Sequence, residues 1–399
     1  MIKLLKNARL VADEVSGSKD EVRDILIAGG KIAAIDKKIE LGNIRATEID
    51  AGGRRVLPGL VDGHVHFIGA AGDEGYTSKT PEIFLSHFMR GGVTTAVGCL
   101  GFGRGCESVE QLYTKAQALR SEGLSAFIYS GAFRVPSPSI TESTATDVAM
   151  LPWVIGVKIA IADGCSSQPT ITEFARIASE AWAAGMQSGK SGVMQVHVGH
   201  HGDPFSWLFE VQKASGVPIT QFILTHCNWS KDLVEMSSAY AKKGGLVDYS
   251  TILDTARGSL TSVAASKAVM HALDSGAPIS NITMSSDGNV GMPIRDEKGV
   301  QHGLYLERVS SLWHEVAALV RLGLPLEDAS SIASKNPALR LGLHSKGALK
   351  LGYDADILVI GDDLKIDWVL AGGKIGLEEG VPKIFSHFEK DIVQESLTK

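Results

Sequence analysis

Short apolar segments rich in β-forming residues alternate with longer helical patterns between Leu57 and Gly288. This alternation predicts repeated strand–helix units around a parallel sheet. Helical patterns cover residues 109–121, 171–184, 231–243 and 261–273. Eight strands are expected, at residues 60–67, 94–98, 126–131, 155–161, 192–198, 222–227, 245–250 and 282–286. Because eight parallel strands with intervening helices close into a barrel, we expect an α/β protein built on a (β/α)8 TIM barrel.

The two ends of the chain have a different pattern. Short strands are expected at residues 3–11, 24–28 and 31–35, and the double glycines at 29–30 and 52–53 predict hairpin turns. Residues 354–360 and 368–375 repeat this pattern near the other end. We therefore expect residues 1–56 and 345–399 to form one small β-sandwich, and residues 57–344 to form the barrel.

Charge and cysteine content exclude several classes of protein. The chain has 39 basic and 45 acidic residues, a net charge of −6, and no block of five like charges, which argues against a nucleic-acid partner. No apolar run approaches the roughly 20 residues of a membrane span, and the first residues are too soon polar for a secretory signal. The cysteines are scattered without a CxxC motif, as expected of free thiols: Cys99, Cys106, Cys165 and Cys227. We expect a soluble cytoplasmic protein with no membrane partner.

Residues of the kind that bind metals follow several of the predicted strands. His64 and His66 are two apart, so they point to the same side of their strand and can share one ion. Each candidate alone could be an ordinary polar residue at a strand end. In a barrel, however, functional residues gather at the carboxyl ends of the strands, and five strands supply candidates there. The predicted metal site comprises His64, His66, Lys158, His197, His226 and Asp287. We expect His200 and His201 to be loop residues rather than ligands.

With these residues in place, the chain resembles the amidohydrolase superfamily over nearly its whole length. The pattern shared with it is an HxH after strand one, a lysine on strand four, histidines on strands five and six, and an aspartate on strand eight. Within the superfamily the chain is most similar to bacterial isoaspartyl dipeptidases. The segments that carry this similarity are GAFRVPS (131–137), VIGVK (154–158), THCN (225–228), KGG (243–245) and SSDGN (285–289).

The resemblance implies two zinc ions and a Lys158 that is carboxylated on its amine. An ammonium group cannot bind a cation, whereas a carbamate offers two anionic oxygens that can bridge two ions. By the same resemblance, His64, His66 and Asp287 hold one ion, while His197 and His226 hold the other. Asp287 would also carry the proton from the attacking water to the leaving nitrogen. The family likeness further implies a homo-oligomer.

The residues that recognise the substrate depart from the family pattern. Isoaspartyl dipeptidases place a carbonyl-polarising tyrosine after strand three, where this chain has Phe133. They place carboxylate-binding arginines after strands four and six, where this chain has Cys165 and Trp229. A thiol or an indole cannot replace a bidentate guanidinium. We therefore expect weak turnover of simple dipeptides such as β-Asp-Leu unless another cation has taken over.

Other residues are candidates for the missing recognition groups. Asp73 or Glu74 would meet the ammonium group of the substrate, and Arg134 or Arg104 could supply a displaced cation.

Three functions remain open from the sequence. The first is hydrolysis of β-aspartyl or related dipeptides with rearranged recognition. The second is an amidohydrolase acting on a cyclic amide, an N-acyl amino acid or an aminated heterocycle, with Phe102, Phe133 and Trp229 lining an apolar pocket. The third is a barrel that has lost catalysis and serves as a scaffold, which the presence of all six ligand residues disfavours.

Overall fold

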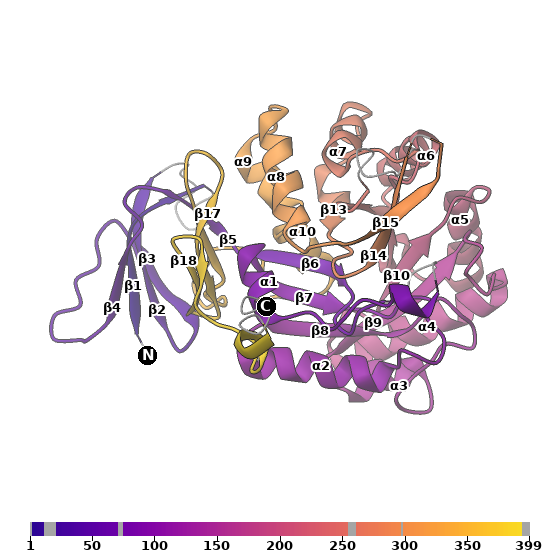
Figure 1. Ribbon diagram of the computed structural model, residues 1–399, viewed down its shortest axis with the longest axis horizontal. Coiled ribbons are helices and arrows are strands. Elements are labelled where there is room, and N and C mark those ends of the chain that lie inside the picture. Colours follow the sequence, from indigo (N-terminus) through magenta and orange to yellow (C-terminus); the bar gives the residue numbers. More distant parts are fainter. Residues whose placement is uncertain (1, 12–20, 71–74, 254–260, 297, 393–399) are drawn as a thin grey trace.

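A computed structural model describes residues 2–11, 21–70, 75–253, 261–296 and 298–392 (Figure 1). Its larger part is an eight-stranded parallel sheet in which each strand pairs with the next along the chain. The expected barrel strands are confirmed, with ends that differ by a few residues. They are β6 (Leu60–Val65), β7 (Val93–Gly98), β8 (Ser125–Gly131), β9 (Val154–Ile161), β10 (Val193–Val198), β11 (Phe222–Thr225), β12 (Leu246–Ser250) and β13 (Ile282–Ser285).

The sheet nearly closes on itself between its first and last strands. Val65 and Gly288 form an isolated parallel bridge, and the His66 amide donates to the Gly288 carbonyl at 2.9 Å. Asp62 adds a side-chain link, because its carboxylate accepts from the Ser286 amide at 3.0 Å. The expected TIM-barrel architecture is therefore confirmed.

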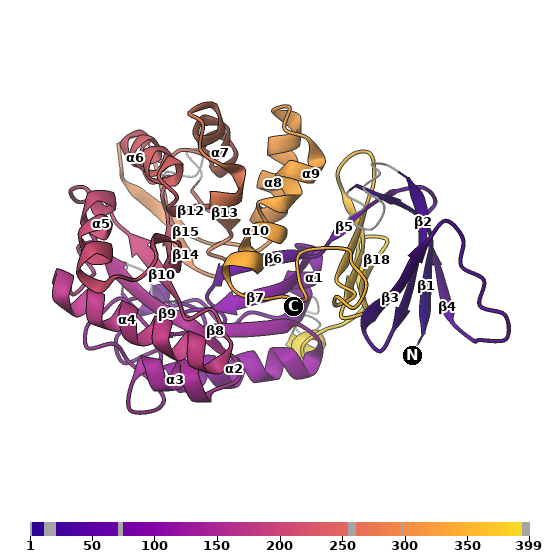
Figure 2. The ribbon, with the colours of Figure 1, turned by 180° about the vertical axis from the view of Figure 1, so that it is seen from behind.

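Helices surround the outside of this barrel (Figure 2). Among the described residues, none of them is long and apolar enough to cross a membrane. They are α1 (Leu85–Arg90), α2 (Val109–Glu122), α3 (Thr144–Met150), α4 (Ile171–Ser188), α5 (Pro204–Ser215), α6 (Lys231–Lys242), α7 (Ala265–Asp274), α8 (Ser311–Arg321), α9 (Leu326–Ser331) and α10 (Lys335–Arg340). Short 3₁₀ turns lie at Tyr76–Ser78, Ile219–Gln221 and Ile279–Asn281.

Strand alternation decides which side chains enter the barrel. Val157 and Ile159 of β9 belong to the large apolar cluster shared with the helices. Because neighbouring residues on a strand point to opposite faces, Lys158 between them points into the barrel. The same alternation on β10 sends Met194 and Val196 outward and His197 inward.

Both ends of the chain join in a second sheet of nine strands, drawn indigo and yellow at one end of the molecule (Figure 1). β5 and β16 pair antiparallel and connect the two halves, and the sheet encloses its own apolar core. The exact domain bounds stay a prediction. The strands are β1 (Lys3–Leu10), β2 (Val22–Ala28), β3 (Lys31–Asp36), β4 (Thr47–Asp50), β5 (Arg55–Pro58), β16 (Ile357–Ile360), β17 (Ile366–Ala371), β18 (Lys374–Glu378) and β19 (Val381–Pro382).

Of the two double-glycine turns expected near the start, one forms a hairpin and the other does not. Gly29 and Gly30 both have positive φ and join the antiparallel strands β2 and β3. Gly52 and Gly53 also have positive φ, but the strands they connect, β4 and β5, both pair with β1 in parallel. The hairpin prediction at residues 52–53 is wrong because this turn shifts the chain along β1 instead of reversing it.

A separate two-stranded hairpin follows the last barrel strand. β14 (Gly291–Arg295) and β15 (Gln301–Leu306) pair antiparallel and belong to neither larger sheet. This hairpin is not among the strands expected from the sequence, and it stands at the end of the barrel where functional residues are expected.

A buried ion cluster centred on Lys346 ties the barrel to the second sheet. The Lys346 amine lies 2.6 Å from the Asp356 carboxylate and 2.8 Å from that of Asp354, and it donates to the Ser125 hydroxyl of β8 at 2.7 Å. The side chains of Lys346 and Asp356 are only 6% and 5% exposed. Removal of one partner would therefore leave an uncompensated charge in the interior.

We predict that Lys346→Met lowers the free energy of unfolding by about 3–5 kcal/mol, because Asp356 then stays buried without its cation. Chemical denaturation monitored by circular dichroism measures this change. Lys365→Met is the matched control, since Lys365 and Asp363 pair at 2.7 Å but are 81% and 54% exposed. The control should leave the stability nearly unchanged, because ion pairs between exposed side chains contribute little. Equal effects of the two variants would contradict a linking role for the buried cluster.

Candidate metal centre and substrate cavity

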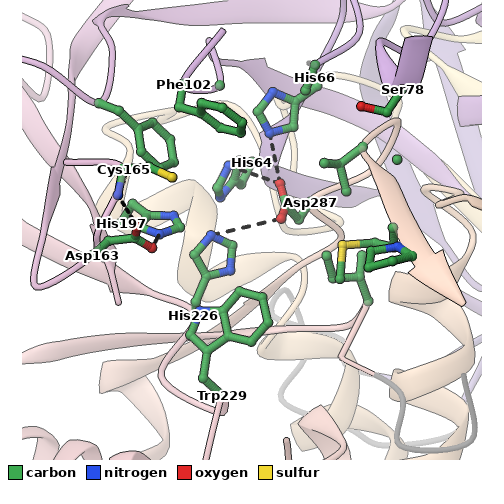
Figure 3. Close-up of a pocket in the computed structure, with 18 of the residues that line it drawn as sticks. His64, His66, Ser78, Phe102, Asp163, Cys165, His197, His226, Trp229 and Asp287 are labelled. Carbon is green, nitrogen blue, oxygen red and sulfur yellow. Dashed lines mark hydrogen bonds and ion pairs between the residues drawn. The ribbon is translucent and has the colours of Figure 1, made fainter. Parts of the chain in front are cut away.

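The six predicted ligand residues lie together at the carboxyl ends of the barrel strands. His64 lies on β6 and His66 directly follows it, Lys158 lies on β9, His197 is on β10, and His226 and Asp287 follow β11 and β13. All six are at most 7% exposed. The close-up in Figure 3 shows the four histidines and Asp287 around one point of the cavity floor.

Asp287 is the centre of this cluster. Its Oδ1 lies 3.0 Å from Nε2 of His66 and 3.2 Å from Nε2 of His64. Its Oδ2 lies 3.9 Å from Nε2 of His226 (Figure 3). Three imidazoles from two strands therefore face a single carboxylate.

His226 and Asp287 have an unusual backbone conformation. Their φ angles are +68° and +49°, in the left-handed region that residues other than glycine seldom adopt. His226 directly follows β11, and Asp287 lies two residues after the end of β13. Strained conformations of this kind cluster at functional sites, where the surrounding structure holds them.

A neighbouring polar group holds the second ring nitrogen of two histidines. His197 Nε2 donates to the Asp163 carboxylate at 2.9 Å, and His226 Nδ1 lies 2.6 Å from the Ser250 hydroxyl. His197 Nδ1 is buried without a partner. Metal-binding histidines are typically oriented by such a contact on the nitrogen that does not bind.

His64 is held by a longer chain of contacts. Its Nδ1 lies 3.4 Å from the Thr225 hydroxyl, which donates to the Asp248 carboxylate at 2.8 Å. Since the Thr225 hydroxyl gives its proton to Asp248, it can accept one from Nδ1 of His64. Nε2 of His64 is then left with its lone pair toward the centre of the site.

Lys158 lies beside the histidine cluster inside the barrel. Its amine lies 2.9 Å from Nε2 of His64 and 3.9 Å from the Cys99 thiol. The side chain is fully buried, and no carboxylate contact is recorded for its amine among the described residues. A carbamate on this amine would put two oxygens among the metal-binding groups.

The electrostatics favour neutral histidines around an ionised aspartate. Burial, with Lys158 nearby, lowers the pKa of His64 well below its usual value, and burial with His197 nearby does the same for His226. Burial also lowers the pKa of His197, although Asp163 opposes this shift. Burial alone would raise the pKa of Asp287, but the surrounding histidines hold it well below its usual value. Neutral imidazole and ionised carboxylate are the forms that bind metals.

These residues fit a metal centre. The ligand atoms of His64, His226 and Asp287 lie within 4.8 Å of one another, as do those of His64, His66 and Cys99. Imidazole nitrogen and carboxylate oxygen are common ligands of zinc and related divalent ions. Nδ1 of His66 and Nδ1 of His197 are buried without a hydrogen-bond partner, and each could bind a cation through its lone pair.

A cavity of about 440 Å³ opens above the cluster. Phe102, Phe133 and Trp229 give it an aromatic wall, and the Phe133 ring packs 4.4 Å from that of His197. The β14–β15 hairpin contributes a further wall through Met292, Arg295 and Tyr305 among others.

The predicted substrate residues have different outcomes. Phe133, Cys165 and Trp229 all line the cavity. Arg134 and Arg104 are not among its lining residues, and Asp73 and Glu74 lie outside the described residues. The recognition roles of these residues stay predictions. His200 lies in the loop after β10, lines the cavity and packs against Trp229, while His201 faces a different hollow.

Sequence reasoning missed the groups that support the histidines and the hairpin that lines the cavity. Asp163 stands five residues after Lys158, and Ser250 ends β12, so both are polar residues at the carboxyl end of a barrel strand. Arg295 and Tyr305 lie farther from any strand end of the barrel, and only the position of their loop after strand eight pointed to them.

Comparison with known proteins places this geometry in a family. A model of the amidohydrolase family matches residues 55–376. The β-aspartyl dipeptidase of the thermophilic keratin degrader Fervidobacterium islandicum AW-1, solved with β-Asp-Leu dipeptide, is 36% identical with a TM-score of 0.86. That alignment covers 96% of this chain and 99% of the dipeptidase.

More distant relatives share parts of the chain or the fold alone. Dihydropyrimidinase from Brevibacillus agri NCHU1002 has a TM-score of 0.69 over 97% of each chain, but only 18% identity. A dihydroorotase of Lactococcus lactis subsp. lactis is 46% identical over 67 residues, and this match spans only 15% of the dihydroorotase.

The resemblance to isoaspartyl dipeptidases is thus confirmed in sequence and in structure along nearly the whole chain. Since the family model matches most of the chain and the barrel carries the cluster at its mouth, the protein belongs to the amidohydrolase family.

Proposed function

We propose that this protein is a binuclear, metal-dependent amidohydrolase that cleaves an amide bond in a small substrate, with β-aspartyl and related dipeptides as the leading class. The observation that carries the proposal is the convergence of four histidines and one aspartate on the floor of a single cavity, with the buried Lys158 amine 2.9 Å from one of the histidines. The similarity to a β-aspartyl dipeptidase over nearly the full length of both chains supports the choice of reaction.

Two zinc ions are the proposed cofactors. His64, His66 and Asp287 would hold one, His197 and His226 the other, and a carboxylated Lys158 would lie between them. Divalent ions supply Lewis acidity, which polarises a carbonyl group and lowers the pKa of water.

Asp287 is the proposed catalytic residue. Its carboxylate is ionised and lies at the cavity floor, so it can accept a proton from an attacking water molecule. The same carboxyl group can then give that proton to the leaving nitrogen. The neighbouring histidines hold Asp287 at 3.0 and 3.2 Å and keep it directed toward the cavity.

The aromatic wall supports a second specificity class. Phe133 has no hydroxyl with which to polarise a carbonyl, and Phe102 and Trp229 make its side of the cavity apolar. A cyclic amide, an N-acyl amino acid or an aminated heterocycle would suit such a wall. A non-catalytic scaffold is the third alternative, and the complete ligand set argues against it.

Location and assembly complete the proposal. All four cysteines are free, which supports a reducing, cytoplasmic environment. The family likeness supports a homo-oligomer.

The function is tested by metal analysis and a substrate panel. We expect about two equivalents of metal after reconstitution with zinc and bicarbonate, and hydrolysis of at least one substrate among β-aspartyl dipeptides, N-acyl amino acids, cyclic ureides and aminated heterocycles. Elemental analysis and product detection by chromatography give the result. A protein that holds less than one equivalent of metal, or holds two and hydrolyses nothing in the panel, would contradict the proposal.

The role of Lys158 gives a sharper prediction. Lys158→Ala should lose metal and activity, and a short carboxylic acid added to the solution should restore part of both, since it returns oxygens to the same place. Lys115→Ala is the control, because Lys115 lies on α2 and pairs with Glu82 at 3.1 Å on the outside of the barrel. Unchanged metal content in Lys158→Ala would show that the lysine is an ordinary barrel residue.

Asp163 is predicted to position His197. Asp163→Asn should weaken metal binding by about 10- to 100-fold, because His197 loses the partner that fixes its ring. The hydrogen bond from His197 holds the pKa of Asp163 below its usual value. Asp163 therefore stays ionised at and above the usual pKa of an aspartate, and the contact with His197 is lost only at lower pH. The effect should therefore be constant between about pH 6 and 8.

Competition with a chelator measures this metal affinity. Asp274→Asn, an exposed aspartate at the end of α7, is the control and should leave the affinity unchanged. Equal metal affinities for Asp163→Asn and the unmodified protein would refute the positioning role.

A further inference from the structure

The β14–β15 hairpin forms part of the wall of the cavity. Met292, Pro293 and Arg295 of β14 line the cavity, as do Leu304 and Tyr305 of β15. In the view of Figure 3 a strand lies across the cavity from Cys165 and Asp163. The hairpin can therefore touch a substrate whose scissile bond lies over the histidines.

Pairing within the hairpin determines which of its side chains share a face. Met292 is opposite Tyr305, and Ile294 is opposite Gly303. The register then shifts by one residue, so that Arg295 is opposite Gln301. Gln301, Gly303 and Tyr305 alternate with the exposed residues His302, Leu304 and Leu306.

This shift has a direct consequence for Arg295. Without it, Arg295 would lie opposite His302, an exposed residue of β15. A bulge of this kind redirects a side chain. Here it places Arg295 on the face of Gln301 and Tyr305, and Arg295 is half-buried.

Arg295 is also the one lysine or arginine among the described residues that line the cavity. The two lining carboxylates, Asp163 and Asp287, are both held by histidines. A substrate carboxylate that enters the cavity therefore meets one guanidinium, and it belongs to the hairpin.

We propose that Arg295 is the carboxylate-binding residue of this cavity, and that the natural substrate is an amide with a free carboxylate on the part that reaches the hairpin. The inference rests on the proposed function, because only an enzyme has a substrate. Carboxylate binding by Arg295 can nevertheless be measured without hydrolysis. A guanidinium suits this task because it can donate two parallel hydrogen bonds to one carboxylate. Its Nη1 already donates to the Gly299 carbonyl at 3.2 Å, a contact within the hairpin that helps to fix the side chain.

The test compares two small probes of similar size, succinate and its neutral diamide succinamide, by calorimetric titration of the zinc-reconstituted protein. We expect succinate to bind more tightly than succinamide. Arg295→Met should weaken succinate binding by about 10- to 100-fold, the range for losing a hydrogen bond to a charged group, and leave succinamide binding unchanged. Arg295→Lys should keep part of the affinity, since it retains the charge but not the paired donors.

Lys298→Met is the matched control, because it removes a cation from the turn of the same hairpin at an exposed position outside the cavity lining. It should bind succinate like the unmodified protein. Metal content and circular dichroism establish that each variant is folded. If Arg295→Met does not fold, Arg295→Lys replaces it as the test variant. Equal succinate affinities in the Arg295 variants and the unmodified protein, or no preference for succinate over succinamide, would overturn the inference. Absence of hydrolysis in the substrate panel would instead count against the proposed function alone.

Discussion

The parallel direction of the eight barrel strands is the constraint on which the rest of this site depends. Because all eight carboxyl ends lie on one rim, residues separated by more than 200 positions, such as His64 and Asp287, come within 3.2 Å of each other. The alternation of side chains along each strand then selects which residues point inward, as it does for Lys158 between Val157 and Ile159. Neither condition requires any long-range signal in the sequence.

For this reason the fold and the cluster could be predicted from the sequence, while its supporting contacts could not. Strand periodicity identifies His197 and Lys158 as inward residues at strand ends. It says nothing about which loop carboxylate meets the outer nitrogen of His197, because Asp163 reaches that atom through a loop of irregular conformation. The Thr225–Asp248 pair was equally hidden, since it depends on the lateral register of two neighbouring strands.

One hairpin was predicted wrongly and another was not predicted, and the two cases have related causes. Gly52 and Gly53 have the conformation of a tight turn, yet the chain does not reverse there. The strands on either side, β4 and β5, each pair in parallel with β1 and not with each other. The β14–β15 hairpin was not predicted because Leu304 and Leu306 occupy exposed positions of β15, so its apolar residues do not mark a buried face. Local sequence gives the conformation of a turn, whereas the partners on either side decide what the turn connects.

In the proposed function, the residues that carry the chemistry and those that determine specificity lie at different depths of the barrel. The floor is built from residues on regular strands and held by buried contacts, and any change there disturbs several neighbours at once. The floor also rests on buried acidic groups. Burial raises the pKa of Asp62 to about 7 and that of Asp248 to about 6, so the ionised form of each is less stable there than in water. The cavity walls come from loops and from a hairpin that pairs with no other sheet. Residues such as Cys165, Trp229 and Arg295 can therefore change without moving the histidines, so the proposed metal-binding floor is compatible with different walls and different substrates.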